Sequence, residues 1–284
     1  MTDVGDTETV ATAGSEPRPT EVQYPGWFES KFGIPIVDDT EQQYYKNTVK
    51  ELVTEFSDSR FWKKFVELLR DADEQELISH DYRLLAKPVA QLDVLPKPWE
   101  SLVEKTFRRN VLNNPNWESG PEAQPPPKGW VTPDNWFTLI PDLVRTTVVV
   151  RYIDGVEIVR GLINQAAHDV GIASVEISWE ARDVGYYALH ANIPVPLSRT
   201  TKGWKRLEET ILIEIQVCTQ VQDVIRSLTH TIYETARRLP KDQDTAWQWQ
   251  YKDVDFTPKY LGHILHYADG MIVNIRDRKK EPEQ

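Results

Sequence analysis

The sequence predicts an α/β (α+β) fold, in which a mixed β-sheet of about five strands is flanked by helices. First, a chain of 284 residues with 40% hydrophobic side chains can bury the core of one large domain or of two smaller ones. Second, several segments are β-branched or alternate between apolar and polar residues, which is typical of strands. Third, apolar residues recur every three or four positions elsewhere, which predicts amphipathic helices packed on the sheet. The strand-like segments are 143–152, 173–180, 187–195 and 211–220, and the helical ones are 41–70, 156–170, 221–238 and 260–267.

Composition limits the class of function. The formal net charge of −11 opposes non-specific binding to nucleic acid, which requires clustered Lys and Arg. No apolar run approaches the length of a membrane span, and the N-terminal residues are acidic where a secretory signal is basic and then apolar. The single cysteine, Cys218, excludes an internal disulfide and a cysteine-based zinc cluster. We therefore expect a globular, cytoplasmic protein with no membrane partner.

Four regions are expected along the chain. Residues 1–25 are rich in Thr, Gly, Glu and Pro and predict a disordered tail. Residues 26–80 predict an N-terminal helical segment whose helical pattern is broken near Ser57 to Ser59. Residues 81–240 predict the central α/β domain, and residues 241–284 predict a C-terminal helical extension.

A candidate anion site lies where a helix is expected to start near Pro98, since proline initiates a helix but does not continue one. Lys97, Ser101 and Lys105 are spaced by four, so they are expected to line one face of that helix from its N-terminal end. Such a face suits a triphosphate. An ordinary solvated helix face has the same composition, and both interpretations stay open on this segment alone.

A proline-rich stretch, 113–135, predicts a long irregular loop that can serve as a lid or an insertion. The pattern then changes to a buried strand, an acidic turn at Asp154-Gly155 and a helix over 156–170. Asp154 lies at the C-terminal end of the strand, where open α/β sheets place ligand-binding groups. It is equally placed to be the N-cap of the helix.

The segment 211–220 alternates apolar and polar residues, so Glu214 and Gln216 are expected on one face of a strand and Ile213 and Ile215 on the other. Before it, the loop from Arg199 to Arg206 is basic and contains a tryptophan, as a loop that grips phosphate and stacks a base would, but solvated loops share this composition. Near the C-terminus, two histidines lie three residues apart, at positions 263 and 266. No carboxylate or cysteine at nearby spacing completes a metal set, so none is expected there.

Six motifs occur in an order that resembles the synthetase domain of RelA/SpoT-type alarmone synthetases. They are residues 97–105, Asp142-Leu143-Val144, the strand ending at Asp154, Gly185-Tyr186-x-x-x-His190, Glu214-Ile215-Gln216 and His230-x-x-Tyr233. The resemblance implies a nucleotidyltransferase-like RelA/SpoT synthetase fold over residues 81–240. It also implies transfer of the β,γ-pyrophosphate of ATP to the 3′-hydroxyl of a nucleotide.

The resemblance also implies roles for individual residues. It assigns ATP-phosphate contacts to Lys97, Ser101 and Lys105, and it assigns the Mg²⁺ carboxylates to Asp154 and Glu214, which hard oxygen ligands suit. Glu214 is further expected to take the proton of the attacking hydroxyl. The remaining assignments are stacking on the acceptor base by Tyr186 and acceptor contacts by Arg182, His190 and Gln216.

Three arginines of the family pattern are replaced here, by Leu95, Thr147 and Cys218, although Arg145 shares a strand face with Thr147 and can substitute in part. The expected function is alarmone-like synthesis from ATP and a purine nucleotide, GDP or GTP. One alternative is toxin-like pyrophosphorylation of the tRNA 3′ end, with a protein antitoxin as a partner. Another is a catalytically degenerate domain that senses nucleotides or binds a partner. The oligomeric state is left open.

Overall fold

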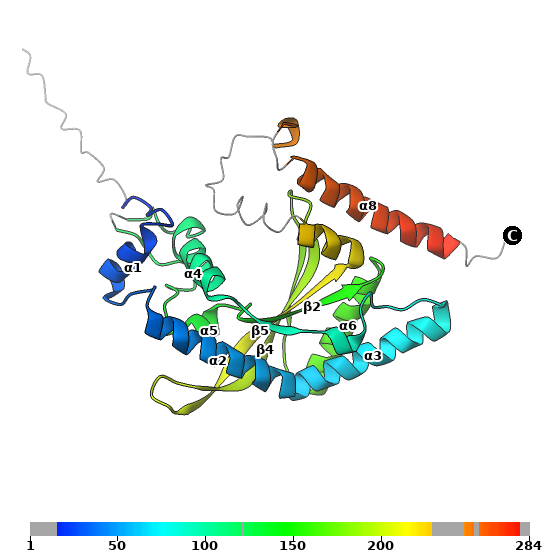
Figure 1. Cartoon of the computed structure of the whole chain (residues 1–284), viewed down its shortest axis with the longest axis horizontal. Coiled ribbons are helices and arrows are strands. Elements are labelled where there is room, and N and C mark those ends of the chain that lie inside the picture. The colour runs from blue at the N-terminus through cyan, green and yellow to red at the C-terminus, as the bar shows by residue number, and fades with distance from the viewer. Residues whose placement is uncertain (1–15, 121, 229–246, 253–255, 279–284) are drawn as a thin grey trace, which may run out of the picture. The chain divides into compact units, whose positions relative to one another are not determined.

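The computed structural model describes residues 16–120, 122–228, 247–252 and 256–278 (Figure 1). The chain divides into two compact units. One unit contains the residues up to Gln42 together with Trp99–Trp136, and the other contains Gln43–Pro98 and Phe137–Gln284. The predicted motif residues His230 and Tyr233 lie outside the described residues.

The smaller unit contains α1 (Tyr24–Phe32), α4 (Trp99–Phe107) and a π-helical turn, η2 (Arg108–Leu112). Its irregular segment is tied down by Asn110, whose side chain donates to the carbonyl of Val131 at 2.8 Å and accepts from the amide of Val131 at 2.9 Å. No strand forms among the described residues of the proline-rich stretch, as predicted.

The tail predicted over residues 1–25 differs from the structure in its second half. Glu16 accepts a hydrogen bond from the indole of Trp27 at 2.6 Å and another from the amide of Ala123 at 2.9 Å. Helix α1 then begins at Tyr24. Both carboxylate oxygens of Glu16 are satisfied by donors distant in sequence, which composition alone does not indicate.

The larger unit is built on a five-stranded mixed sheet with the order β1-β2-β5-β4-β3. Strands β2 and β5 are parallel, and the other neighbouring pairs are antiparallel. The predicted fold class is therefore confirmed. The unpredicted strand is β1, which tolerates a proline because it lies at the edge of the sheet. The strands are β1 (Val94–Pro96), β2 (Val144–Val150), β3 (Glu176–Ala181), β4 (Tyr187–Thr200) and β5 (Arg206–Thr219).

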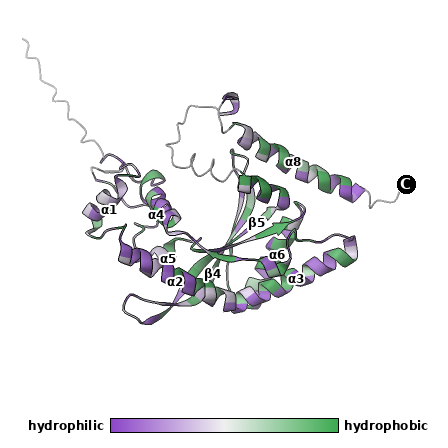
Figure 2. Ribbon diagram, viewed as in Figure 1, coloured by the Kyte–Doolittle hydropathy of each residue, from purple (hydrophilic) through white to green (hydrophobic). Residues whose placement is uncertain are grey.

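One face of this sheet is apolar and carries the core. Helix α6 (Gly155–Asp169) contacts β4 and β5, and α3 (Arg60–His80) contacts α6. Figure 2 shows hydrophobic residues, in green, along the ribbons of these elements. The buried sheet residues on this face are Val144, Val148, Ile213, Ile215, Val217, Leu189, Ala191 and Ile193.

The predicted break between the two N-terminal helices is confirmed. Helix α2 (Asp39–Asp58) ends just before Ser59, and α3 follows directly. The hydroxyl of Ser59 accepts a hydrogen bond from the amide of Trp62 at 3.1 Å, so it is the N-cap of α3. A further short helix, α5 (Trp136–Leu139), precedes β2.

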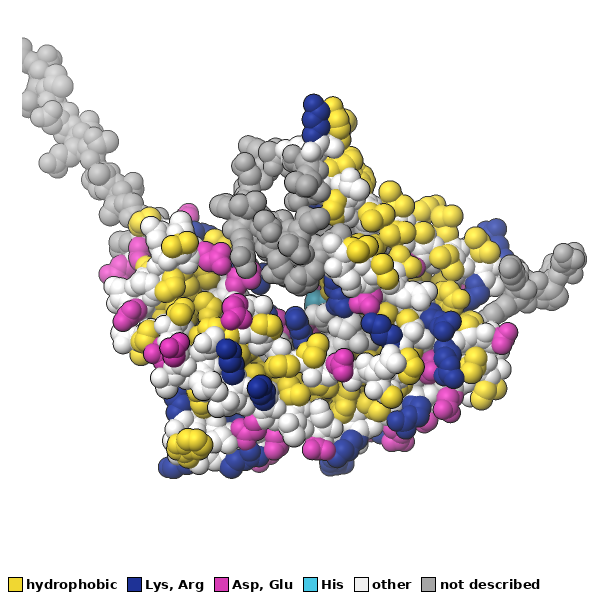
Figure 3. All heavy atoms as spheres, viewed as in Figure 1, with side chains coloured by type: hydrophobic (Ala, Val, Ile, Leu, Met, Phe, Trp, Pro, Cys, Tyr) yellow, Lys and Arg dark blue, Asp and Glu magenta, His cyan; other side chains and the backbone are white. Residues whose placement is uncertain are grey.

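A helix over 220–228 follows β5, and α8 (Phe256–Arg278) is the last described element. Helix α8 approaches the turn before β4 at Gly185, where a Cβ added to Gly262 would lie 2.2 Å from the Gly185 carbonyl oxygen. The hydroxyl of Thr219 also donates to Asp269 at 2.5 Å. Exposed apolar side chains of α8 include Ile264 and Ile275. Figure 3 shows hydrophobic side chains on the surface where α8 lies. No described helix has both the length and the apolarity that a membrane crossing requires.

Candidate functional site

The opposite face of the sheet is polar, and the strand register brings several of the predicted site residues together on it. Arg145 of β2 lies beside Glu214 of β5, and Glu214 lies beside Asn192 of β4. One pair further along, Gln216 lies between Thr147 of β2 and His190 of β4. Side chains two apart on a strand share a face, so the register alone groups these residues.

Glu214 is the centre of this group. Its Oε1 lies 3.4 Å from Nδ1 of His190, and its Oε2 accepts a hydrogen bond from the Gln216 amide at 2.5 Å. Burial raises the pKa of Glu214, but the hydrogen bond and charge of His190 lower it by more, so that the net pKa lies below its ordinary value. Glu214 is therefore a buried carboxylate that keeps its negative charge at neutral pH.

Tyr186 and His190 form a second pair on the same side. The Tyr186 hydroxyl and Nε2 of His190 lie 2.9 Å apart, so His190 connects Tyr186 to Glu214. The guanidinium of Arg182 lies 5.3 Å from the centre of the Tyr186 ring and donates to Glu180 at 2.8 Å. The predicted acceptor residues Tyr186, His190, Arg182 and Gln216 are thus brought together by β4, β5 and the turn before β4.

A second carboxylate within electrostatic reach of Glu214 comes from Asp142, two residues before β2. Asp142 contributes a charge that raises the pKa of Glu214, which places the two carboxylates within electrostatic reach. The Lys97 ammonium donates to Asp142 at 2.8 Å, and both side chains are buried. The Tyr45 hydroxyl donates to the carbonyl of Lys97 at 2.7 Å and fixes the lysine backbone.

The strand register does not reproduce the predicted pairing of Asp154 with Glu214, because Glu214 of β5 pairs near the start of β2 whereas Asp154 lies beyond the end of β2. Arg145 is the register partner of Glu214, and β2 continues for five residues to Val150 before the turn at Asp154 begins. At about 3.3 Å per residue, Asp154 follows a point already about 16 Å along the strand. Two ligands of one ion lie within a few ångströms of each other. The strand register therefore does not bring Asp154 and Glu214 together.

Asp154 has a different partner in the structure. The Arg276 guanidinium of α8 donates to both of its carboxylate oxygens, at 2.6 and 3.3 Å. Arg276 also lies over the rings of Tyr82 and Tyr152, at 4.7 and 5.0 Å from their centres. Asp154 occupies the N-cap position of α6, but its side chain makes no capping hydrogen bond. In the described structure Asp154 therefore forms an ion pair with α8.

The predicted helix face with Lys97, Ser101 and Lys105 is also corrected. Helix α4 begins at Trp99, so Lys97 lies outside it, where the lysine amide donates to the Leu143 carbonyl at 2.8 Å and extends the pairing of β1 with β2. Lys97 belongs to the larger unit, whereas Ser101 and Lys105 lie half-buried on α4 in the smaller one.

The basic loop is the turn of a long hairpin. Strands β4 and β5 stay paired as far as Thr200 and Arg206. Arg199 is buried and donates to Glu209 at 2.8 Å, while Arg206 forms ion pairs with Glu51 and Glu55 of α2. Two of the loop's cations are therefore neutralised within the fold, whereas the Trp204 side chain is 91% exposed.

Sequence reasoning missed two features of the polar face. Asp142 is the first residue of the motif Asp142-Leu143-Val144, but no metal role was predicted for it. Arg226, in the helix over 220–228, donates to the side-chain oxygen of Gln216 at 3.1 Å. The sequence shows only that Arg226 follows Gln216 by ten residues and lies in a predicted helix.

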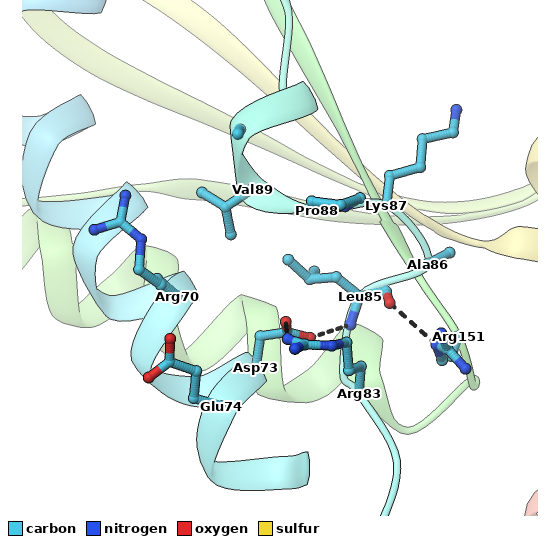
Figure 4. A pocket seen from close by; sticks show the side chains of 11 residues that line it. Arg70, Asp73, Glu74, Arg83, Leu85, Ala86, Lys87, Pro88, Val89 and Arg151 are labelled. Atoms are coloured by element: carbon cyan, nitrogen blue, oxygen red, sulfur yellow. Dashed lines mark hydrogen bonds and ion pairs between the residues drawn. The ribbon is translucent and has the colours of Figure 1, made fainter.

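The larger unit also has a pocket of about 530 Å³ beside α3 (Figure 4). Asp73 lines this pocket and accepts a hydrogen bond from the Arg83 guanidinium at 2.7 Å and another from the Leu85 amide at 2.9 Å. Arg151 closes one end through a 3.2 Å hydrogen bond to the Leu85 carbonyl. None of the predicted site residues lines this pocket.

The chain is similar to several solved structures. The small alarmone synthetase 1 from Bacillus subtilis bound to its product pppGpp is 15% identical, with 86% of this chain and 100% of that chain covered and a TM-score of 0.49. A GTP pyrophosphokinase family protein from Streptococcus pneumoniae is 19% identical, with 79% and 93% covered and a TM-score of 0.47. The small alarmone synthetase 2 from Bacillus subtilis is 18% identical, with 75% and 96% covered and a TM-score of 0.41. No protein-family model and no curated protein match the sequence. At these identities, the similarity assigns no role to any residue.

Proposed function

We propose that this protein transfers the β,γ-pyrophosphate of ATP to the 3′-hydroxyl of a purine nucleotide. The observation that carries the proposal is Glu214, a buried carboxylate kept charged by His190 and Gln216 on a sheet face that also presents Tyr186. Activation of a nucleotide hydroxyl requires a general base within reach of it. An aromatic side chain nearby can hold the nucleotide by stacking on its base.

Asp142 and Glu214 fit Mg²⁺ as a pair of hard oxygen ligands. The described residues contain no group of three or more His, Cys, Asp or Glu that could hold an ion, so phosphate and water would complete the coordination, as is usual for Mg²⁺. When bound, the ion would neutralise negative charge on the transferring group. The Lys97 ammonium, 2.8 Å from Asp142, would place a further positive charge beside the same phosphates.

The side chains divide the work between orientation and proton transfer. Tyr186 stacks on the base of the acceptor nucleotide, and Arg182 lies over the ring of Tyr186. Glu214 accepts the proton of the 3′-hydroxyl while the hydroxyl oxygen bonds to the β-phosphorus of ATP. The bond from that phosphorus to the α-phosphate oxygen breaks, and AMP leaves with the electron pair.

The test is transfer of label from γ-labelled ATP, in the presence of Mg²⁺, to GDP, GTP or deacylated tRNA. Label is expected on a guanine nucleotide, with AMP as the second product. Glu214→Gln is expected to abolish transfer, whereas Glu208→Gln, an exposed position further along the same strand, is expected to leave it unchanged. Absence of transfer to every acceptor by the wild-type protein would contradict the proposal and favour a degenerate nucleotide-binding domain.

The tRNA 3′ end remains an acceptor in this panel because Trp204 is 91% exposed at the tip of the β4–β5 hairpin, where it can stack on an unpaired base. Toxin-like activity, with a protein antitoxin as the partner, requires label on tRNA and growth arrest on expression. Growth arrest should then disappear in Glu214→Gln. Label on a mononucleotide alone would exclude this alternative.

A further inference from the structure

Arg226 lies over the polar face of the sheet although it belongs to the helix that follows β5. Its guanidinium donates to the side-chain oxygen of Gln216 at 3.1 Å, and the amide of the same Gln216 donates to Glu214 at 2.5 Å. One glutamine side chain therefore separates Arg226 from the carboxylate that activates the acceptor. The sequence motifs give this arginine no part in that group.

A second cation converges on the same place. Arg226 donates to Asp223 at 2.7 Å, and the Lys87 ammonium lies 3.2 Å from the other oxygen of Asp223. Figure 4 shows the Lys87 side chain directed away from the Asp73–Arg83 pair, although Lys87 also lines the pocket beside α3. The Asp223 side chain is 17% exposed, while those of Arg226 and Lys87 are 30% and 57% exposed. A largely buried carboxylate thus holds two accessible cations together with a net charge of +1.

Arg226 remains a cation in this environment and keeps donors available. Burial lowers its pKa, but Cys218, Asp223 and Tyr186 raise it by more, so the net pKa lies above its ordinary value. Its hydrogen bonds to described residues use one N–H on each terminal nitrogen. The other three of its five guanidinium donors make no hydrogen bond to a residue that the structure describes.

The wall beside these cations is apolar and adjoins Tyr186. Val149, Ala188 and Cys218 form a buried cluster, against which Ala86 and Tyr186 pack. Cys218 lies two residues beyond Gln216 on the same face of β5, and Arg226 donates to Gln216, so the cations border the surface on which a base would lie. A nucleotide has this combination of a flat apolar ring and an anionic group at its edge.

We propose that Arg226 and Lys87, held together by Asp223, bind the 5′-phosphate groups of the acceptor nucleotide whose base packs on Tyr186. This inference rests on the proposed function, since it concerns the acceptor of that reaction. Charge-assisted hydrogen bonds to phosphate are the strongest that these side chains make, and the forked guanidinium suits two phosphate oxygens at once.

The experiment compares the binding of GDP and guanosine to the full chain, without ATP, by calorimetry. The wild-type protein is expected to bind GDP more tightly than guanosine. Arg226→Ala is expected to weaken GDP binding by about tenfold to one hundredfold and to leave guanosine binding unchanged. Lys87→Ala is expected to have the same selectivity with a smaller effect, because Lys87 is more exposed. ADP and adenosine form a parallel pair that reports on the base.

Two control variants separate a local phosphate contact from a general loss of positive charge. Arg160→Ala removes an equally charged residue from the exposed surface of α6 and should change neither affinity. Arg226→Lys keeps the charge, loses the fork and should recover part of the GDP affinity. Asp223 keeps Lys87 as a partner in Arg226→Ala, so the helix is not left with an uncompensated carboxylate. Equal loss of GDP and guanosine binding in Arg226→Ala, or no loss of either, would overturn the inference.

Failure of the proposed function is distinguishable from failure of this inference. Glu214→Gln should abolish transfer and retain the preference for GDP over guanosine. A phosphate preference without transfer in the wild-type protein would contradict the reaction and leave the phosphate site standing. Transfer that is unchanged in Arg226→Ala, with unchanged GDP binding, would contradict the phosphate site alone.

Discussion

At the scale of single residues, neighbouring side chains rather than water stabilise the negative charge of Glu214. Its folded-state pKa lies below the ordinary value of 4.5, so folding favours the deprotonated form. The resulting stabilisation is present above the unfolded-state pKa and is lost as the pH falls through the folded-state pKa. His190 and Gln216 are the groups that bring this about.

The first prediction is a pH dependence of stability. Thermal unfolding of the wild-type protein and of Glu214→Gln should differ most near neutral pH, and the difference should shrink as the pH falls below about 4.5. Glutamine has no carboxylate to titrate and removes this dependence. A difference that stays constant between neutral and acid pH would show that the Glu214 carboxylate gains nothing from its neighbours.

The second prediction distinguishes the role of Asp142 from that of Asp154. Asp142→Asn should lower transfer by roughly 100-fold or more, because it removes an oxygen anion beside the phosphates. Asp154→Asn should leave transfer intact and lower the free energy of unfolding by less than about 1 kcal/mol, since its ion pair with Arg276 is partly exposed. Initial rates and urea unfolding measure the two effects. The reverse pattern would restore Asp154 to the metal site.

The two aspartates also show what the sequence can and cannot predict at this scale. Both flank the same strand, and an acidic turn after a buried strand is a frequent ligand position. The choice between them depends on the register of β2 against β5, which sets Arg145 beside Glu214. Register arises from pairing between segments almost seventy residues apart and leaves no local mark in either segment.

At the scale of secondary structure, local signals were sufficient for most of the fold. Ser59 separates α2 from α3, and alternation predicted β4 and β5. The edge strand β1 was missed because Pro96 argues against a strand, although a proline is tolerated at an edge. The docking of α8 was missed because it depends on a close approach of two backbones.

The third prediction concerns that approach. In Gly262→Ala the new Cβ would lie 2.2 Å from the Gly185 carbonyl oxygen, so α8 must shift and the free energy of unfolding should fall. Gly270→Ala is the matched control, since a Cβ there meets nothing within 4 Å. The control should gain up to about 1 kcal/mol from helix propensity. Equal stabilisation by both substitutions in urea unfolding would show that α8 does not pack on Gly185.

At the scale of the whole molecule, the net charge of −11 sets a constraint on acceptors. It repels a polyanion more strongly than a mononucleotide, so a nucleic acid would need its own contact surface. The tip of the β4–β5 hairpin is the exposed aromatic candidate. Strand β5 remains paired as far as Arg206, eight residues from Glu214, and Trp204 lies in the turn beyond it. Trp204 is therefore roughly 26 Å or more from Glu214 along the hairpin.

The fourth prediction follows from that separation. Trp204→Ala should leave the rate of transfer to GDP unchanged and should lower transfer to deacylated tRNA if any is detected with the wild-type protein. The thermal midpoint should not fall, because the side chain is 91% exposed. Parallel assays with the two acceptors measure both effects. A loss of GDP transfer would show that the hairpin tip contributes to the mononucleotide site.

Cys218 gives this molecule a chemical reporter of its own opening. It is the only cysteine of the chain, and burial raises the pKa of its thiol to about 11. A thiol reagent at limiting concentration should therefore modify only the small fraction of molecules in which the wall beside Tyr186 is open to solvent. The modification rate, divided by the rate for the unfolded chain, converts to an opening free energy at one residue. A nucleotide that closes this face would register as protection, measured without label, enzyme assay or mutation.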